Sequence, residues 1–137
     1  MKNFFSATMV VLVIILSANF CAAYDYNYDP DYVYVTTAHQ GSYYFYLPSV
    51  NVQEYNPPHY QIAGTFVHVY DIGNGWKERR FAVIKRYNLY TKETFSRDKN
   101  GYWRKTEIEP DCTATKVNRS FADALFRAAY GMDFYGY

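Results

Sequence analysis

The residues that could carry metal chemistry in this chain are few and scattered. The three histidines are His39, His59 and His68, and no His-x-x-x-His or Cys-x-x-Cys spacing accompanies them. A metal site needs several imidazole, thiolate or carboxylate ligands that converge on one ion, within about 2–2.6 Å. His68 stands between aromatic residues in a strand-like segment, where a hydrogen-bonded core histidine is the ordinary interpretation. We therefore expect no metal and no cofactor.

The short motifs that build common active sites do not occur either. The sequence has no Gly-x-Ser-x-Gly, no P-loop and no Gly-x-Gly-x-x-Gly. Acyl transfer and nucleotide chemistry therefore lack the backbone devices on which they depend. We expect no catalytic residue and no enzymatic activity.

Basic and aromatic side chains alternate in the second half of the chain. No Lys or Arg lies between Asn3 and Trp76, and the basic residues are concentrated from Lys77 onward. This mixture could bind an acidic glycan or an acidic stretch of a protein, or it could simply solubilise the later strands. The candidate binding surface comprises Arg80, Arg86, Tyr87, Tyr102, Trp103, Arg104 and Lys105.

Overall composition narrows the class of partner. The chain has 137 residues, 14 Lys and Arg against 13 Asp and Glu, and 17 tyrosines. A near-zero net charge argues against a strongly basic nucleic-acid-binding protein. Tyrosine combines a large contact area with a polar tip, which suits either a binding surface or the core of a small sheet.

Residues 1–23 have the three parts of a secretory signal peptide. Lys2 supplies the positive start, residues 9–16 form a short apolar run, and small residues precede a cleavage site between Ala23 and Tyr24. The run is too short for a transmembrane helix, which needs about 20 apolar residues. We expect an exported protein, in the periplasm, on the cell surface or outside the cell, with no membrane span after cleavage.

Export changes the cysteine count. Cys21 leaves with the signal peptide, and Cys112 remains as the only thiol. An unpaired cysteine in an exported chain is either a buried apolar residue or an intermolecular link. Both interpretations stay open here, and the second would give a disulfide-linked homodimer.

The remaining residues predict one α+β domain over 32–137, after a flexible, exposed Tyr/Asp-rich leader over 24–31. The Tyr-x-Tyr alternation of this leader also fits an edge strand with one aromatic face. Period-two patterns and Asn-Gly turns predict an antiparallel meander sheet of about five to six strands. Its expected strands cover 32–37, 43–47, 60–72, 79–90, 91–96 and 102–108, and 50–55 is a shorter extended piece. A helix capped by Ser120 and ended by Gly131 should pack on this sheet.

The order of these landmarks resembles the surface-adhesin protein E-like family of small exported bacterial envelope domains. The matching pieces are an aromatic opening strand, the run Tyr43-Tyr-Phe-Tyr-Leu-Pro-Ser-Val50, the long strand around residues 66–69, Asn100-Gly-x-Trp103, and the helix near residues 122–126. The resemblance implies an antiparallel sheet packed on a helix, no catalysis, and binding of host matrix proteins. The chain departs from a lipid-anchored or disulfide-stapled pattern.

Two functional hypotheses follow. The first is an exported, non-enzymatic envelope domain, adhesin-like, that binds a host or envelope protein or a glycan. The alternative is a periplasmic structural or assembly component that self-associates through a sheet edge or through Cys112.

Overall fold

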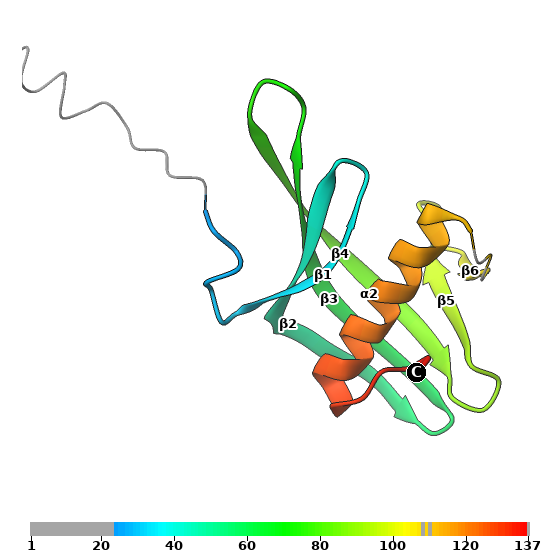
Figure 1. Ribbon diagram of the computed structural model, residues 1–137. Helices are drawn as coiled ribbons and strands as arrows, with labels where there is room; N and C mark the ends of the chain where they lie inside the picture. Colours follow the sequence, from blue (N-terminus) through cyan, green and yellow to red (C-terminus); the bar gives the residue numbers. More distant parts are fainter. Residues whose placement is uncertain (1–23, 108, 110, 137) are drawn as a thin grey trace, which may run out of the picture.

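Six antiparallel strands and one helix make up the fold (Figure 1). The computed structural model describes residues 24–107, 109 and 111–136. The strands lie in the sheet in chain order, as β1 (Tyr32–Ala38), β2 (Gly41–Asn56), β3 (His59–Asp71), β4 (Trp76–Asn88), β5 (Glu93–Arg97) and β6 (Trp103–Lys105). Helix α2 (Thr113–Tyr130) lies across one face, here called the inner face. The predicted α+β class, with a meander sheet and one C-terminal helix, is confirmed.

Strand β2 joins two segments that the sequence analysis separated. The ladder between β2 and β3 is irregular between Tyr46 and Asn51, and this interval contains Pro48. Proline is tolerated where a strand bulges, because no ladder hydrogen bond is required from its nitrogen. Ser49 fills the interruption: its Oγ accepts a hydrogen bond from the Thr65 amide at 2.7 Å. The chain can therefore stay extended through the proline.

Helix α2 begins two turns earlier than predicted. Its N-cap position is Cys112, and Ser120 lies inside the helix with its Oγ donating to the Lys116 carbonyl at 2.9 Å. The prediction of Ser120 as the cap is wrong because Val117 is also buried and extends the apolar face of the helix towards its start. The predicted end at Gly131 is confirmed, since this residue has a φ of 75°.

The core lies between α2 and the inner face of the sheet. Buried aromatic and aliphatic side chains fill it: Phe45, Ile62, Phe66, Tyr87, Phe121, Leu125, Phe126 and Phe134. Gly64 on β3 allows the helix to approach closely. A Cβ at this position would lie 2.4 Å from the Phe45 ring and 2.8 Å from Leu125.

The outer face of the sheet is covered in part by the segment that precedes β1. Tyr26 is only 3% exposed and packs with Tyr44 and Val67, which are also buried. The prediction that residues 24–31 are exposed is therefore wrong at Tyr26. The physical reason is that Tyr44 and Val67 would otherwise present apolar surface to water on the face that α2 does not cover. The described part of the chain contains no helix long and apolar enough to cross a membrane.

Candidate functional site

Tyrosines gather on the outer face of β1 and β2 and on the segment before them. Strand register places Tyr32 opposite Tyr46 and Tyr34 opposite Tyr44, so these four rings share one face of the sheet. Tyr26 stacks on Tyr44 with ring centroids 5.1 Å apart. We call this surface the tyrosine face; it consists of Tyr24, Tyr26, Tyr32, Tyr34, Tyr44 and Tyr46.

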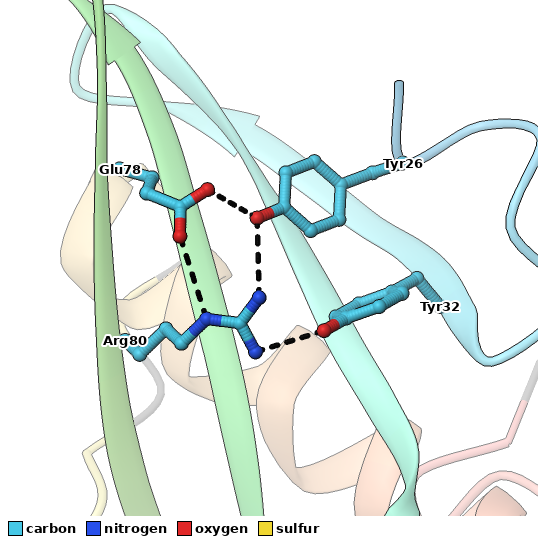
Figure 2. A network of polar contacts seen from close by, with 4 residues as sticks. All are labelled: Tyr26, Tyr32, Glu78 and Arg80. Atoms are coloured by element: carbon cyan, nitrogen blue, oxygen red, sulfur yellow. Dashed lines mark hydrogen bonds and ion pairs between the residues drawn. The ribbon is translucent and has the colours of Figure 1, made fainter. Parts of the chain in front are cut away.

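Two charged residues of β4 hold the tyrosine face in place (Figure 2). The Tyr26 hydroxyl donates a hydrogen bond to the Glu78 carboxylate. Arg80 forms an ion pair with Glu78 at 3.4 Å and donates hydrogen bonds to the hydroxyls of Tyr32, at 2.8 Å, and Tyr26, at 3.4 Å. The network therefore ties the segment before β1, and β1 itself, to a strand some 50 positions later.

The pKa values of Tyr26 and Arg80 are consistent with the direction of the hydrogen bonds that these residues donate. Burial, followed by the hydrogen bond to Glu78, raises the pKa of Tyr26 to about 12, so its hydroxyl keeps the proton that it donates. The hydrogen bond to Tyr32 raises the pKa of Arg80 further above its ordinary value. Near neutral pH the Tyr26 hydroxyl is therefore neutral and the Arg80 guanidinium is charged.

A cavity of about 420 Å³ opens beside this network. Its aromatic walls are Tyr24, Tyr26, Tyr44 and Trp76, and we call it the aromatic cavity. Tyr24 is 53% exposed and Trp76 is 64% exposed, so two of the four rings present free surface. The polar groups of the lining come from Asp25, Asn27, Ser42, Lys77 and Glu78. The volume lies within the range of about 300–1,000 Å³ found for small-molecule sites.

Four aromatic rings with a few polar groups can bind a ligand that has one apolar face and a polar rim. The rings come from three places in the chain: the segment before β1, strand β2 and the start of β4. Among residues 24–107, 109 and 111–136, no group of three or more His, Cys, Asp or Glu side chains is arranged to hold a metal ion. The arrangement favours binding through contact and hydrogen bonding.

The basic surface predicted from the sequence is only partly assembled. Tyr87 does not belong to it: this residue is 1% exposed, and its hydroxyl donates to the Ala122 carbonyl in the core at 2.9 Å. Period-two alternation places Tyr87 on the inner face, next to α2. The alternation of Phe81, Val83 and Tyr87 along the sequence carries the signal for this placement.

The structure brings Arg86 and Trp103 together, with the guanidinium 4.1 Å from the indole ring centroid. Lys105 lies in the same row across β5 and forms an ion pair with Glu93. Arg104 forms an ion pair with Asp98 at 2.8 Å. Arg104 and Lys105 are thus each paired with a carboxylate.

Two more members of the predicted surface lie apart from this row. Tyr102 is 68% exposed beside the turn before β6. Arg80 belongs to the network under the tyrosine face. The predicted basic surface is therefore divided into the row around Arg86 and Trp103, the separate Tyr102, and Arg80 under the tyrosine face.

Cys112 is half-buried at the start of α2. The backbone amides of Thr115 and Ala114 lower the pKa of its thiol, which increases the thiolate fraction near neutral pH. An intermolecular disulfide through Cys112 stays a prediction. Of the two residues at the predicted cleavage site, Tyr24 lines the aromatic cavity and Ala23 lies outside the described residues.

Tyr26 and Trp76 were not among the site residues predicted from the sequence. The Tyr-x-Tyr alternation of the segment before β1 carried a signal for Tyr26, because it indicates a one-sided aromatic surface. Trp76 follows the Asn74-Gly75 turn, and no local pattern indicates that it lines the same cavity as Tyr24.

Comparisons with known proteins leave this geometry as the main guide to function. No family model, no curated protein and no solved structure matches the chain. The resemblance to the surface-adhesin protein E-like family accordingly stays a prediction.

Proposed function

We propose that this chain is an exported, non-enzymatic binding domain of the bacterial cell envelope, adhesin-like, that binds its ligand on the tyrosine face. The observation that carries the proposal is the aromatic cavity, with two exposed rings, Tyr24 and Trp76, beside two covered ones. The signal-peptide pattern of residues 1–23 supports export. The ligand is a protein or a glycan outside the cytoplasm.

The way in which the rings are held supports binding. Arg80 and Glu78 fix Tyr26 and Tyr32 before any ligand arrives, so little side-chain entropy is lost on association. Tyrosine and tryptophan are also the residues that most often dominate binding energy at interfaces. A preformed aromatic surface of this kind can bind tightly over a modest area.

The test compares two double variants in a binding assay against immobilised matrix proteins and a glycan panel. Tyr24→Ser with Trp76→Ala removes the exposed rings of the cavity. Tyr90→Ser with Tyr102→Ser removes two exposed tyrosines elsewhere on the surface. The proposal predicts that the first variant loses at least about tenfold in affinity for the bound ligand and that the second binds as the wild type does. Equal losses in both variants would refute the proposal.

Self-association through β1 is the second candidate function. Strand β1 lies at an edge of the sheet and contains no charged residue, whereas edge strands of monomeric proteins often carry charges that block pairing. Analytical ultracentrifugation of the wild type and of Thr37→Lys tests this function. A dimer that the substitution dissociates supports pairing through β1, and a wild-type monomer at high concentration refutes it. A dimer dissociated only by reductant or by Cys112→Ser would instead indicate the thiol.

A further inference from the structure

We infer that the aromatic cavity binds a neutral saccharide. This inference rests on the proposed function, since it names the chemical class of the group bound on the tyrosine face. Three properties of the cavity carry it: the arrangement of its rings, the polar groups left free beside them, and the cancellation of charge in its lining.

The rings form walls rather than a flat patch. Tyr24 meets Tyr26 edge to face, with centroids 4.6 Å apart and planes at 68°. Tyr26 and Tyr44 stack nearly parallel and form a second surface behind them. A sugar ring has faces made of C–H groups, which pack on an aromatic ring as other apolar groups do, and a rim of hydroxyls.

Hydrogen-bonding groups lie beside these walls with capacity left for a ligand. Asp25 Oδ1 accepts from the backbone amide of Asn27 at 3.0 Å and from its side-chain amide at 3.1 Å. Among the residues that the structure describes, these contacts use only one oxygen of the Asp25 carboxylate. Asn27 Nδ2 keeps a second hydrogen. A carboxylate and an amide held side by side can accept from one hydroxyl of a sugar and donate to the next.

The charged side chains around the cavity balance one another. Glu78 is paired with Arg80, and the other two charged residues of the lining are Asp25 and Lys77, which have opposite signs. An anionic ligand would meet two carboxylates, and a cationic ligand would meet Lys77 and the guanidinium. Desolvating an ionic group without a surplus of opposite charge is unfavourable. A neutral polyhydroxyl ligand avoids this cost.

The first experiment reads ligand binding from Trp76 alone. The chain has two tryptophans, Trp76 and Trp103, so Trp103→Phe leaves Trp76 as the single indole. This protein is titrated with chitotetraose, maltotetraose and mannotetraose, with the matched pair lactose and 3′-sialyllactose, and with choline chloride. We expect a saturable change in Trp76 fluorescence with at least one neutral saccharide. Sialyllactose should bind no more tightly than lactose, and choline should not bind.

Calorimetry of variants then separates stacking from charge. Trp76→Ala and Tyr24→Ser should each weaken binding of the neutral saccharide by about three- to tenfold, the effect of losing one aromatic contact. Lys77→Gln should change the affinity by less than about threefold, because a neutral ligand has no ionic bond to lose. The affinity should also be the same in about 20 mM and about 500 mM NaCl. Tyr90→Ser is the matched control and should bind as the wild type does.

The results distinguish failure of this inference from failure of the proposed function. Tighter binding of sialyllactose than of lactose, or an affinity that falls as salt rises, would overturn the neutral saccharide and leave a binding role in place. Binding of a matrix protein through Trp76, with no binding or competition by any neutral saccharide of the panel, would also overturn the saccharide and leave the binding role in place. If no ligand of any class binds through the tyrosine face of a correctly folded protein, both the inference and the proposed function are wrong.

Discussion

Replacing Lys85 gives a sharp test of how the inner face is packed. This lysine is 1% exposed and lies on β4 opposite Ile62 and Ser96. Its ammonium donates hydrogen bonds to Ser96 Oγ at 2.6 Å and to Asn118 Oδ1 at 3.3 Å, and both acceptors are uncharged. Burial lowers the pKa of Lys85 from its ordinary value of 10.5 to about 8.

The lowered pKa determines how stability depends on pH. Between pH 8 and pH 10.5 the unfolded chain retains the Lys85 proton and the folded chain has lost it, so the free energy of unfolding rises with pH. The difference between the two pKa values corresponds to about 3 kcal/mol in all. Between pH 7 and pH 9 the expected rise in the free energy of unfolding is about 1 kcal/mol.

Lys85→Met removes the ammonium and keeps an unbranched side chain of similar length. The absolute stability of the variant also reflects Ser96 and Asn118, which lose a donor, so the informative quantity is the change with pH. Urea unfolding followed by circular dichroism at pH 7 and pH 9 measures it. The wild type should gain about 1 kcal/mol more than Lys85→Met over this interval.

The control is Lys77→Met, at an exposed position of the same strand, which should keep the wild-type dependence on pH. If Lys85→Met gains as much stability as the wild type between pH 7 and pH 9, Lys85 is solvated in solution. The described burial of the Lys85 ammonium between β4 and α2 would then be wrong.

Substitutions at three further positions test other parts of the fold. Gly64→Ala should lower the free energy of unfolding by about 1–3 kcal/mol in urea titrations, because its Cβ would come within 2.4 Å of the Phe45 ring; unchanged stability would contradict that contact. His68 stacks between two tyrosine rings, and burial lowers its pKa. As pH falls below 6.5, the imidazole is therefore protonated in the unfolded chain before it is protonated in the folded chain. The wild type should therefore lose more stability than His68→Phe between pH 7 and pH 5.5, and parallel curves would refute this. Tyr26→Phe should cost about 1 kcal/mol through the lost hydrogen bond to Glu78, and Tyr26→Ala about 3 kcal/mol or more through lost packing. Equal stability of the wild type and Tyr26→Ala in denaturant titrations would show that residues 24–31 are detached from the sheet.

The strands and turns of the sheet could be predicted because residue alternation and turn residues determine them locally. Asn100-Gly101 stands at the turn before β6, and Gly101 has the positive φ, 86°, that favours glycine. Period-two alternation along β3 agrees with the structure, which places Ile62 and Phe66 on the inner face and Val67 on the outer face. The helix start was missed because a Ser–Asp spacing suggested a cap at Ser120, whereas burial of Val117 favours an earlier start.

The aromatic cavity could not be predicted in this way. Its walls come from Tyr24, Tyr44 and Trp76, which are brought together by the meander and by the segment that crosses the outer face. Lys85 illustrates a related difficulty. Alternation places it on the inner face between Val83 and Tyr87, but a lysine there is unusual, and only the three-dimensional packing shows that its ammonium is buried.

A two-dimensional NMR titration with chitotetraose and maltotetraose tests the central claim most directly. Binding in the aromatic cavity predicts that the largest changes in amide and indole resonances occur at residues 24–27, 42–44 and 76–78. Changes centred on Trp103 and the strands around it, or no saturable change with either sugar, would contradict the claim that this cavity is a saccharide site.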